Sequence, residues 1–225
     1  MIEQFCEKLK NTYNAKIVCL GDSVTHGYFE SHENMHGTTD YMEVYHKKLA
    51  DIIKYFFPAY DIEIINSGVG GECAADGYKR IKDDVLKHNP DLVTVCYGLN
   101  DVNGSIDEYI SGLDRIFTDL DSSNIPYVFM TPNMLNTAVT LPILCSYAEK
   151  TAKLQNDKVM DRYMSAAVDC AVKHKAVVCD CYNEWKRLHK AGIDTNRLLA
   201  NGINHPHREM HRLFAYKLFE TIFLQ

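Results

Sequence analysis

The sequence lacks the features of a membrane or nucleic-acid-binding protein. It has no apolar run approaching the roughly eighteen residues that a membrane-spanning helix requires, and no Lys/Arg cluster longer than two residues. Its formal net charge of −6 argues against nucleic-acid binding, because phosphate backbones bind to basic surfaces. The N-terminal segment MIEQFCEKLK has no apolar stretch of the signal-peptide kind, so we expect a cytoplasmic protein.

The sequence also lacks a complete motif for a cofactor or a metal. The glycines of residues 68–71 begin a G-x-G-x-x-G pattern, but Cys73 stands where its last glycine would be. His207 and His211 are four residues apart, a spacing that zinc sites use, but no glutamate of an H-E-x-x-H motif lies between them. We therefore expect solvated histidines, no cofactor and no metal.

The composition of the sequence predicts one globular domain, residues 1–225, with a sizeable core. Hydrophobic residues make up 46% of the chain and charged residues 24%. Five short apolar runs are predicted to be strands: Lys16–Leu20, Ile62–Asn66, Leu92–Tyr97, Tyr127–Thr131 and Ala176–Cys179. Each is continuously apolar rather than alternating, which is typical of strands in a parallel sheet that is covered on both faces.

Longer segments with helical periodicity alternate with these runs. They are predicted to be helices over about Tyr41–Phe57, Ala74–His88, Ile106–Leu120, Tyr147–His174 and Arg208–Phe223. This alternation predicts the α/β class: a three-layer α/β/α sandwich around a flavodoxin-like five-stranded parallel sheet. The segment Pro132–Ser146 breaks the pattern, and we expect it to form a surface excursion near the functional site.

Polar residues follow three of the predicted strands. Ser23 comes after the first strand, residues 66–71 follow the second and Asn100 follows the third, while His205 lies just before the last helix. Parallel strands end at one edge of the sheet, where ligands bind in open α/β folds, so these residues are expected to meet there. A serine, a histidine base and donors from the backbone N–H groups of Ser23 and Gly71 and the Asn100 side chain are the parts of an acyl-transfer site.

Four segments in this order resemble the sequence blocks of the SGNH, or GDSL-like, hydrolase family. They are Gly21-Asp22-Ser23, Gly71, Gly98-Leu99-Asn100-Asp101 and His205-Pro206. The resemblance implies a serine esterase with Ser23 as nucleophile, His205 as general base, and Ser23, Gly71 and Asn100 as the oxyanion hole. It also implies a small-molecule ester substrate, often an acetyl or short-chain ester of a carbohydrate, and no cofactor.

One position departs from the family pattern. The family usually carries an aspartate three residues before the histidine, and Gly202 occupies that place here. The alternatives for the group that orients the His205 ring are Asn201, a backbone carbonyl, and Asp194 or another acidic residue. We favour Asn201, since an amide oxygen can accept the imidazole N–H.

Two other readings of the sequence remain open. In the first, the missing aspartate marks lost catalysis, and the chain is a non-catalytic small-ligand-binding protein on the same fold. A separate structural alternative for Ser23 is to cap the following helix, a common role for serine. In the second, the chain is a metallo-hydrolase whose histidines hold zinc.

Overall fold

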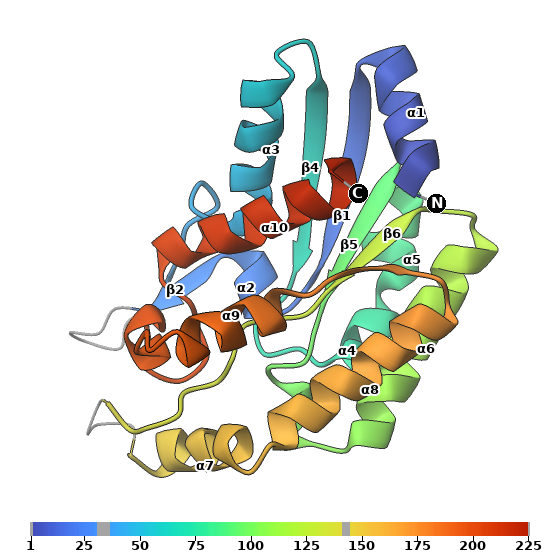
Figure 1. The fold of residues 1–225 in the computed structure, drawn as a ribbon. Helices are drawn as coiled ribbons and strands as arrows, with labels where there is room; N and C mark the ends of the chain where they lie inside the picture. Colours follow the sequence, from blue (N-terminus) through green and yellow to red (C-terminus); the bar gives the residue numbers. More distant parts are fainter. Residues whose placement is uncertain (1, 31–36, 141–144, 225) are drawn as a thin grey trace.

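Five parallel strands form the central sheet in a computed structural model of the chain, which describes residues 2–30, 37–140 and 145–224. Their order across the sheet is β4-β1-β5-β6-β7 (Figure 1). The strands are β1 (Asn14–Gly21), β4 (Asp61–Gly68), β5 (Leu92–Cys96), β6 (Tyr127–Met130) and β7 (Val177–Cys179). Each of the five predicted strands is present, and this is the flavodoxin-like order, so the predicted fold class is confirmed.

Helices cover both faces of the sheet (Figure 1). The layer on one face contains α1 (Ile2–Thr12), α3 (Tyr45–Phe56) and α10 (His211–Phe223), and the other contains α4 (Ala74–Lys79), α6 (Ile106–Ser122) and α8 (Val159–Lys173). The remaining helices are α2 (Ser23–His26), α5 (Ile81–Asp84), α7 (Cys145–Asn156) and α9 (Cys181–Lys190). Among the described residues, no helix combines the length and apolar character needed to cross a bilayer.

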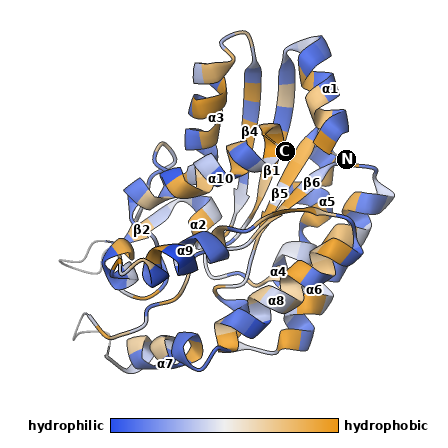
Figure 2. Cartoon of the chain, in the orientation of Figure 1, coloured by the Kyte–Doolittle hydropathy of each residue, from blue (hydrophilic) through white to orange (hydrophobic). Residues whose placement is uncertain are grey.

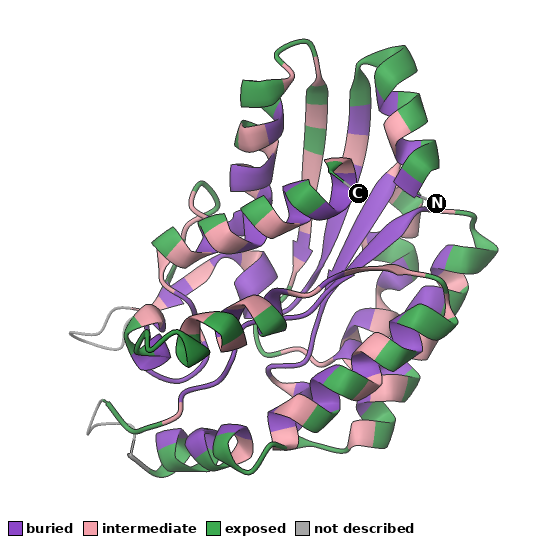
Figure 3. Ribbon diagram, viewed as in Figure 1, coloured by how far each residue is buried: buried purple, intermediate pink, exposed green. Residues whose placement is uncertain are grey.

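The core lies on the two faces of the inner strands. Every residue of β5 and β6 is buried, as Figure 3 shows, and Figure 2 shows that the same strands are among the most apolar segments. Helix α6 packs against them through side chains three or four residues apart: Tyr109, Leu113, Ile116, Phe117 and Leu120. The continuous apolar runs are therefore explained by burial on both faces.

Two of the predicted helices are interrupted. The segment Tyr147–His174 is divided into α7 and α8, because Lys158 adopts a left-handed conformation with φ 62°. The segment Ala74–His88 is divided into α4, α5 and the 3-10 turn η1 (Leu86–His88). The expected surface excursion Pro132–Ser146 is wrong for its first part: residues 132–140 form neither helix nor strand, but residues 132–136 are buried and only residues 138–140 are exposed. Residues 141–144 lie outside the described part.

A small hairpin next to the nucleophile was not predicted from the sequence. It consists of β2 (Tyr28–Glu30) and β3 (Gly37–Thr39), which pair antiparallel with Glu30 opposite Gly37. The hairpin begins directly after α2, so it stays close to the carboxyl end of β1.

Further short 3-10 turns are η2 (Asp101–Asn103), η4 (Thr195–Leu198) and η5 (Arg208–Met210).

Arg80 ties together the loops at the carboxyl edge of the sheet. Its Nε donates to both carboxylate oxygens of Glu72, at 3.0 and 2.8 Å, and a terminal nitrogen donates to the Ser67 carbonyl at 2.7 Å. The Glu72 carbonyl in turn accepts from Asn100 Nδ2 at 2.9 Å. The ion pair thus fixes the segment after β4, and the hydrogen bond to the Glu72 carbonyl connects this segment with the loop after β5.

Replacing Arg80 by methionine is expected to lower the free energy of unfolding by about 3 kcal/mol, because Glu72 then loses its charged partner in a mostly buried place. The side chains of Arg80 and Glu72 are only 15% and 17% exposed. Urea denaturation measures the change, and adding Glu72→Gln should recover part of it.

The matched control is Lys153→Met, which removes the exposed ion pair with Asp157. It should change the free energy of unfolding by less than about 1 kcal/mol. Equal losses in the two variants would contradict the stabilising role given to Arg80.

Candidate active site

Ser23 stands at the first position of the short helix that follows β1. The Asp22 carboxylate caps this helix by accepting the Val24 N–H at 2.9 Å. Gly21 allows the tight turn, since a Cβ there would lie 2.2 Å from Thr25 Oγ1 and 2.7 Å from the Cys96 carbonyl oxygen. The sequence thus places the Ser23 hydroxyl at the carboxyl edge of the sheet.

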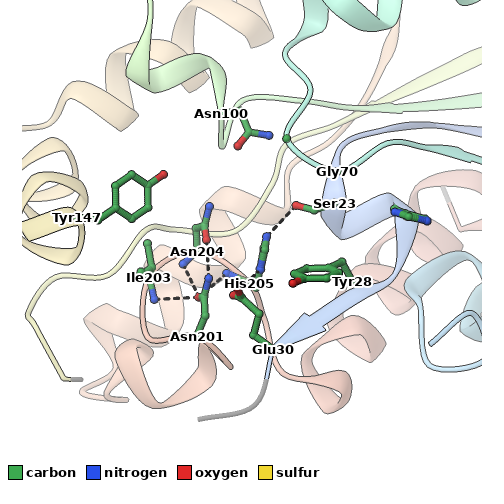
Figure 4. Close-up of a pocket in the computed structure, with 12 residues that line it drawn as sticks. Ser23, Tyr28, Glu30, Gly70, Asn100, Tyr147, Asn201, Ile203, Asn204 and His205 are labelled. Atoms are coloured by element: carbon green, nitrogen blue, oxygen red, sulfur yellow. Dashed lines mark hydrogen bonds and ion pairs between the residues drawn. The ribbon is translucent and has the colours of Figure 1, made fainter. Parts of the chain in front are cut away.

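The Ser23 hydroxyl meets the His205 ring. Ser23 Oγ and His205 Nε2 are 2.8 Å apart, the distance of a good hydrogen bond (Figure 4). The residues are 182 positions apart in the chain, and the fold alone brings them together. The predicted nucleophile and the predicted base are therefore in direct contact.

The ring of His205 is oriented by a residue that the sequence analysis missed. His205 Nδ1 lies 2.9 Å from Glu30 Oε2, so the neutral ring donates from Nδ1 and leaves the Nε2 lone pair for the Ser23 hydroxyl (Figure 4). Burial acts to raise the pKa of Glu30, but the hydrogen bond and charge of His205, with a hydrogen bond from Asn201, bring it below the usual value. Glu30 is thus a carboxylate at neutral pH.

This geometry corrects the preference for Asn201 as the orienting residue. Asn201 Oδ1 accepts the backbone N–H groups of Ile203, Asn204 and His205 at 2.9 to 3.0 Å. Asn201 therefore shapes the loop that carries the histidine and does not accept from its ring. Asp194, the other side chain considered, instead caps η4 through the Asn196 N–H.

Gly71 and Asn100, which are predicted to form the oxyanion hole together with Ser23, line the same cavity as Ser23. Gly71 has φ 81°, a left-handed conformation that favours glycine, and a Cβ at this position would meet no atom within 4 Å. Asn100 uses one N–H of its amide to bond the Glu72 carbonyl, which leaves the second N–H for a ligand. Both positions are compatible with donors that face a substrate.

The cavity measures about 430 Å³, within the usual range for small-molecule sites. Tyr147 at the start of α7 and Tyr28 of the hairpin contribute aromatic walls (Figure 4). Its other lining residues are Ser23, His26, Glu30, Gly70, Gly71, Asn100, Asn201, Ile203, Asn204 and His205. The loop after β1, the loops after β4 and β5, and the histidine loop therefore converge on one hollow.

Two buried carboxyl groups support the loops behind this cavity. Burial raises the pKa of Asp22 to about 7 and that of Asp101 to about 6. Asp22 caps α2 through the Val24 N–H. In the same way, Asp101 Oδ1 accepts the Ala74 N–H at the start of α4, at 2.9 Å. Both side chains thus bond the first turns of helices that follow the sheet edge.

The histidine pair considered for zinc has a different environment from the one expected. His211 is 1% exposed rather than solvated, and its Nδ1 accepts the Tyr45 N–H at 3.1 Å. Burial holds the pKa of His211 well below the usual value, so the ring is neutral. In the described part of the chain, neither His207 nor His211 belongs to a group of three or more side chains placed to hold a metal.

Comparisons with known proteins agree with the fold described above. A curated relative, the acetylxylan esterase of Geobacillus stearothermophilus, is 22% identical over 211 residues, which cover 92% of this chain and 93% of the relative. The crystal structure of that esterase, Axe2, superposes with a TM-score of 0.72 at 20% identity, covering 94% of this chain and 95% of its own. Its solved catalytic mutants replace a serine, an aspartate or a histidine by alanine.

A second structure, the α/β hydrolase LAE5 from the metagenome of Lake Arreo, superposes with a TM-score of 0.70 at 21% identity. The match covers 92% of this chain and 94% of LAE5. The sequence profile of the GDSL-like lipase/acylhydrolase family matches residues 19–213, a range that includes Ser23, Gly71, Asn100 and His205. The chain therefore belongs to the GDSL-like lipase/acylhydrolase family and is an acyl-ester hydrolase.

Proposed function

We propose that the protein hydrolyses acetyl and other short-chain acyl esters, including those of carbohydrates, through an acyl-enzyme on Ser23. The observation that carries the proposal is the 2.8 Å contact between Ser23 Oγ and His205 Nε2 on the wall of an open cavity. A serine is a weak nucleophile unless a base takes its proton, and this contact supplies the base.

In the first half of the reaction, Ser23 Oγ attacks the ester carbonyl carbon while its proton passes to His205 Nε2. The backbone N–H groups of Ser23 and Gly71 and the side-chain N–H of Asn100 hold the oxyanion. The ester C–O bond then breaks, and His205 returns the proton to the departing alcohol. In the second half, His205 Nε2 takes a proton from a water molecule as the water oxygen attacks the acyl carbonyl carbon. The bond between this carbon and Ser23 Oγ then breaks, His205 returns the proton to Ser23 Oγ, and the carboxylic acid leaves.

The cavity supports a small substrate whose alcohol part is polar and carries no negative charge. None of its described lining residues is lysine or arginine, and tyrosines form part of its wall. Such a surface suits hydroxyl-rich groups, which hydrogen-bond to side chains and lie against aromatic rings. The similarity to an acetylxylan esterase supports acetylated sugars as the first substrates to assay.

The rival reading, a non-catalytic binding protein, rested on the absence of an aspartate before His205. The contact between Glu30 and His205 weakens that argument, because a carboxylate is present at the ring nitrogen after all. No other observation favours the binding protein over an esterase.

Replacing Ser23 by alanine is expected to abolish hydrolysis of p-nitrophenyl acetate and its initial burst, because no acyl-enzyme can form. Circular dichroism should be unchanged, since the hydroxyl is not part of the core. Ser165→Ala, which changes an exposed serine, is the matched control and should keep wild-type activity. Normal steady-state hydrolysis by the Ser23 variant would end the proposal.

Replacing Asn100 by alanine removes one oxyanion donor, a loss of about 3 kcal/mol, so kcat should fall about a hundredfold or more. KM should change little, because the donor acts mainly on charge that develops in the transition state. Asn11→Ala, at an exposed position of α1, is the control. A raised KM at unchanged kcat would instead place Asn100 in ground-state binding.

A further inference from the structure

We propose that Glu30 is the charged positioning residue of His205, so that the acid comes from the hairpin beside the nucleophile and not from the histidine loop. This inference rests on the proposed function. In the family one aspartate fills the role that two residues share here. Glu30 supplies the charge, and Asn201 shapes the loop.

The location of the pair favours a functional ion pair over an incidental surface contact. The side chains of His205 and Glu30 are only 12% and 16% exposed, so water screens their interaction weakly. When His205 takes the serine proton, the positive charge appears 2.9 Å from the carboxylate. Glu30 therefore stabilises the imidazolium at the step that generates the nucleophile.

Packing on both sides fixes the hairpin that carries Glu30. Phe29 is 1% exposed, with the guanidinium of Arg208 4.5 Å above its ring and the His211 ring 4.8 Å away. Tyr28 packs edge-on against the His205 ring, with centroids 5.7 Å apart. The segment that follows His205 therefore packs against β2, the strand that carries Glu30.

Asn201 complements Glu30 and does not replace it. Its oxygen is taken by three backbone N–H groups, and its Nδ2 donates to Asn204 Oδ1 at 2.9 Å. A hydrogen bond from Asn201 also helps to keep the pKa of Glu30 low. An aspartate at this position would remove that donor and bring a second negative charge toward Glu30.

Glu30→Gln tests the inference. The variant keeps the shape of the side chain and removes its charge, so kcat for p-nitrophenyl acetate should fall roughly a thousandfold. The acid limb of the pH profile of kcat/KM should also move to lower pH, because an imidazolium without its carboxylate loses its proton more readily. The titratable groups near His205 also include Asp22, His26, Tyr28 and His211, and the variant leaves these side chains in place.

Glu30→Asp provides the comparison that keeps the charge. It should lose about tenfold in kcat through the shorter reach, while its acid limb stays at the wild-type position. Glu3→Gln makes the same change of net charge at an exposed position of α1 and should match the wild type. If Glu30→Gln does not fold, Glu30→Ala, which also removes the carboxylate, carries the test, and wild-type kcat in that folded variant would overturn the inference.

The two proposals fail in different ways. A folded Glu30→Gln variant with kcat within threefold of wild type, or with an unmoved acid limb, overturns the role of Glu30. If Ser23→Ala is inactive in the same experiment, the esterase mechanism survives that result. Full activity in Ser23→Ala would instead remove the proposed function itself.

Discussion

The hydrogen bond between Ser23 and His205 depends on a sheet whose strands end level with one another. Gly21, the last residue of β1, is paired with Gly68 on β4 and with Cys96 on β5. The three loops that follow therefore leave the sheet at the same height, on both sides of the point where the strand order reverses. A crevice at such a point is where open α/β sheets bind ligands, and here it holds Ser23, His205 and the proposed oxyanion donors Gly71 and Asn100.

Holding this crevice open requires buried polar groups, which are unfavourable unless they are bonded. Asp22 and Asp101 each accept a backbone N–H at the start of a helix. Arg80 and Glu72 form an ion pair in the segment after β4, and the Glu72 carbonyl joins this segment to the loop after β5 by accepting from Asn100. Polar contacts thus fix the loops at the carboxyl edge of the sheet, while the apolar strands beneath these loops form the buried core.

Much of this arrangement is predictable from the sequence, because it follows from local patterns. Continuous apolar runs indicate the five strands, and the residues directly after them indicate where Ser23, Gly71 and Asn100 lie. The boundaries of helices are less predictable: the periodicity of Tyr147–His174 continues through Lys158, where the backbone turns left-handed and divides the helix. Helix α9 and the first helix α1 were also missed.

Glu30 escaped prediction for a different reason. It ends a strand of only three residues, which gives no periodic signal, and its partner His205 lies 175 residues away. The family pattern also directs attention to the residues just before the histidine, where Asn201 has the right polarity but a different task. No spacing rule in a single sequence connects the hairpin to the histidine loop; only their packing does.

Mass spectrometry of the enzyme, quenched in acid during turnover of an acetyl ester, tests directly whether Ser23 is the nucleophile. We expect one acetyl group on the peptide that contains Ser23, present during turnover and absent once the substrate is exhausted. Rapid turnover with residue 23 unmodified, or an acetyl group carried by a different residue, would contradict it.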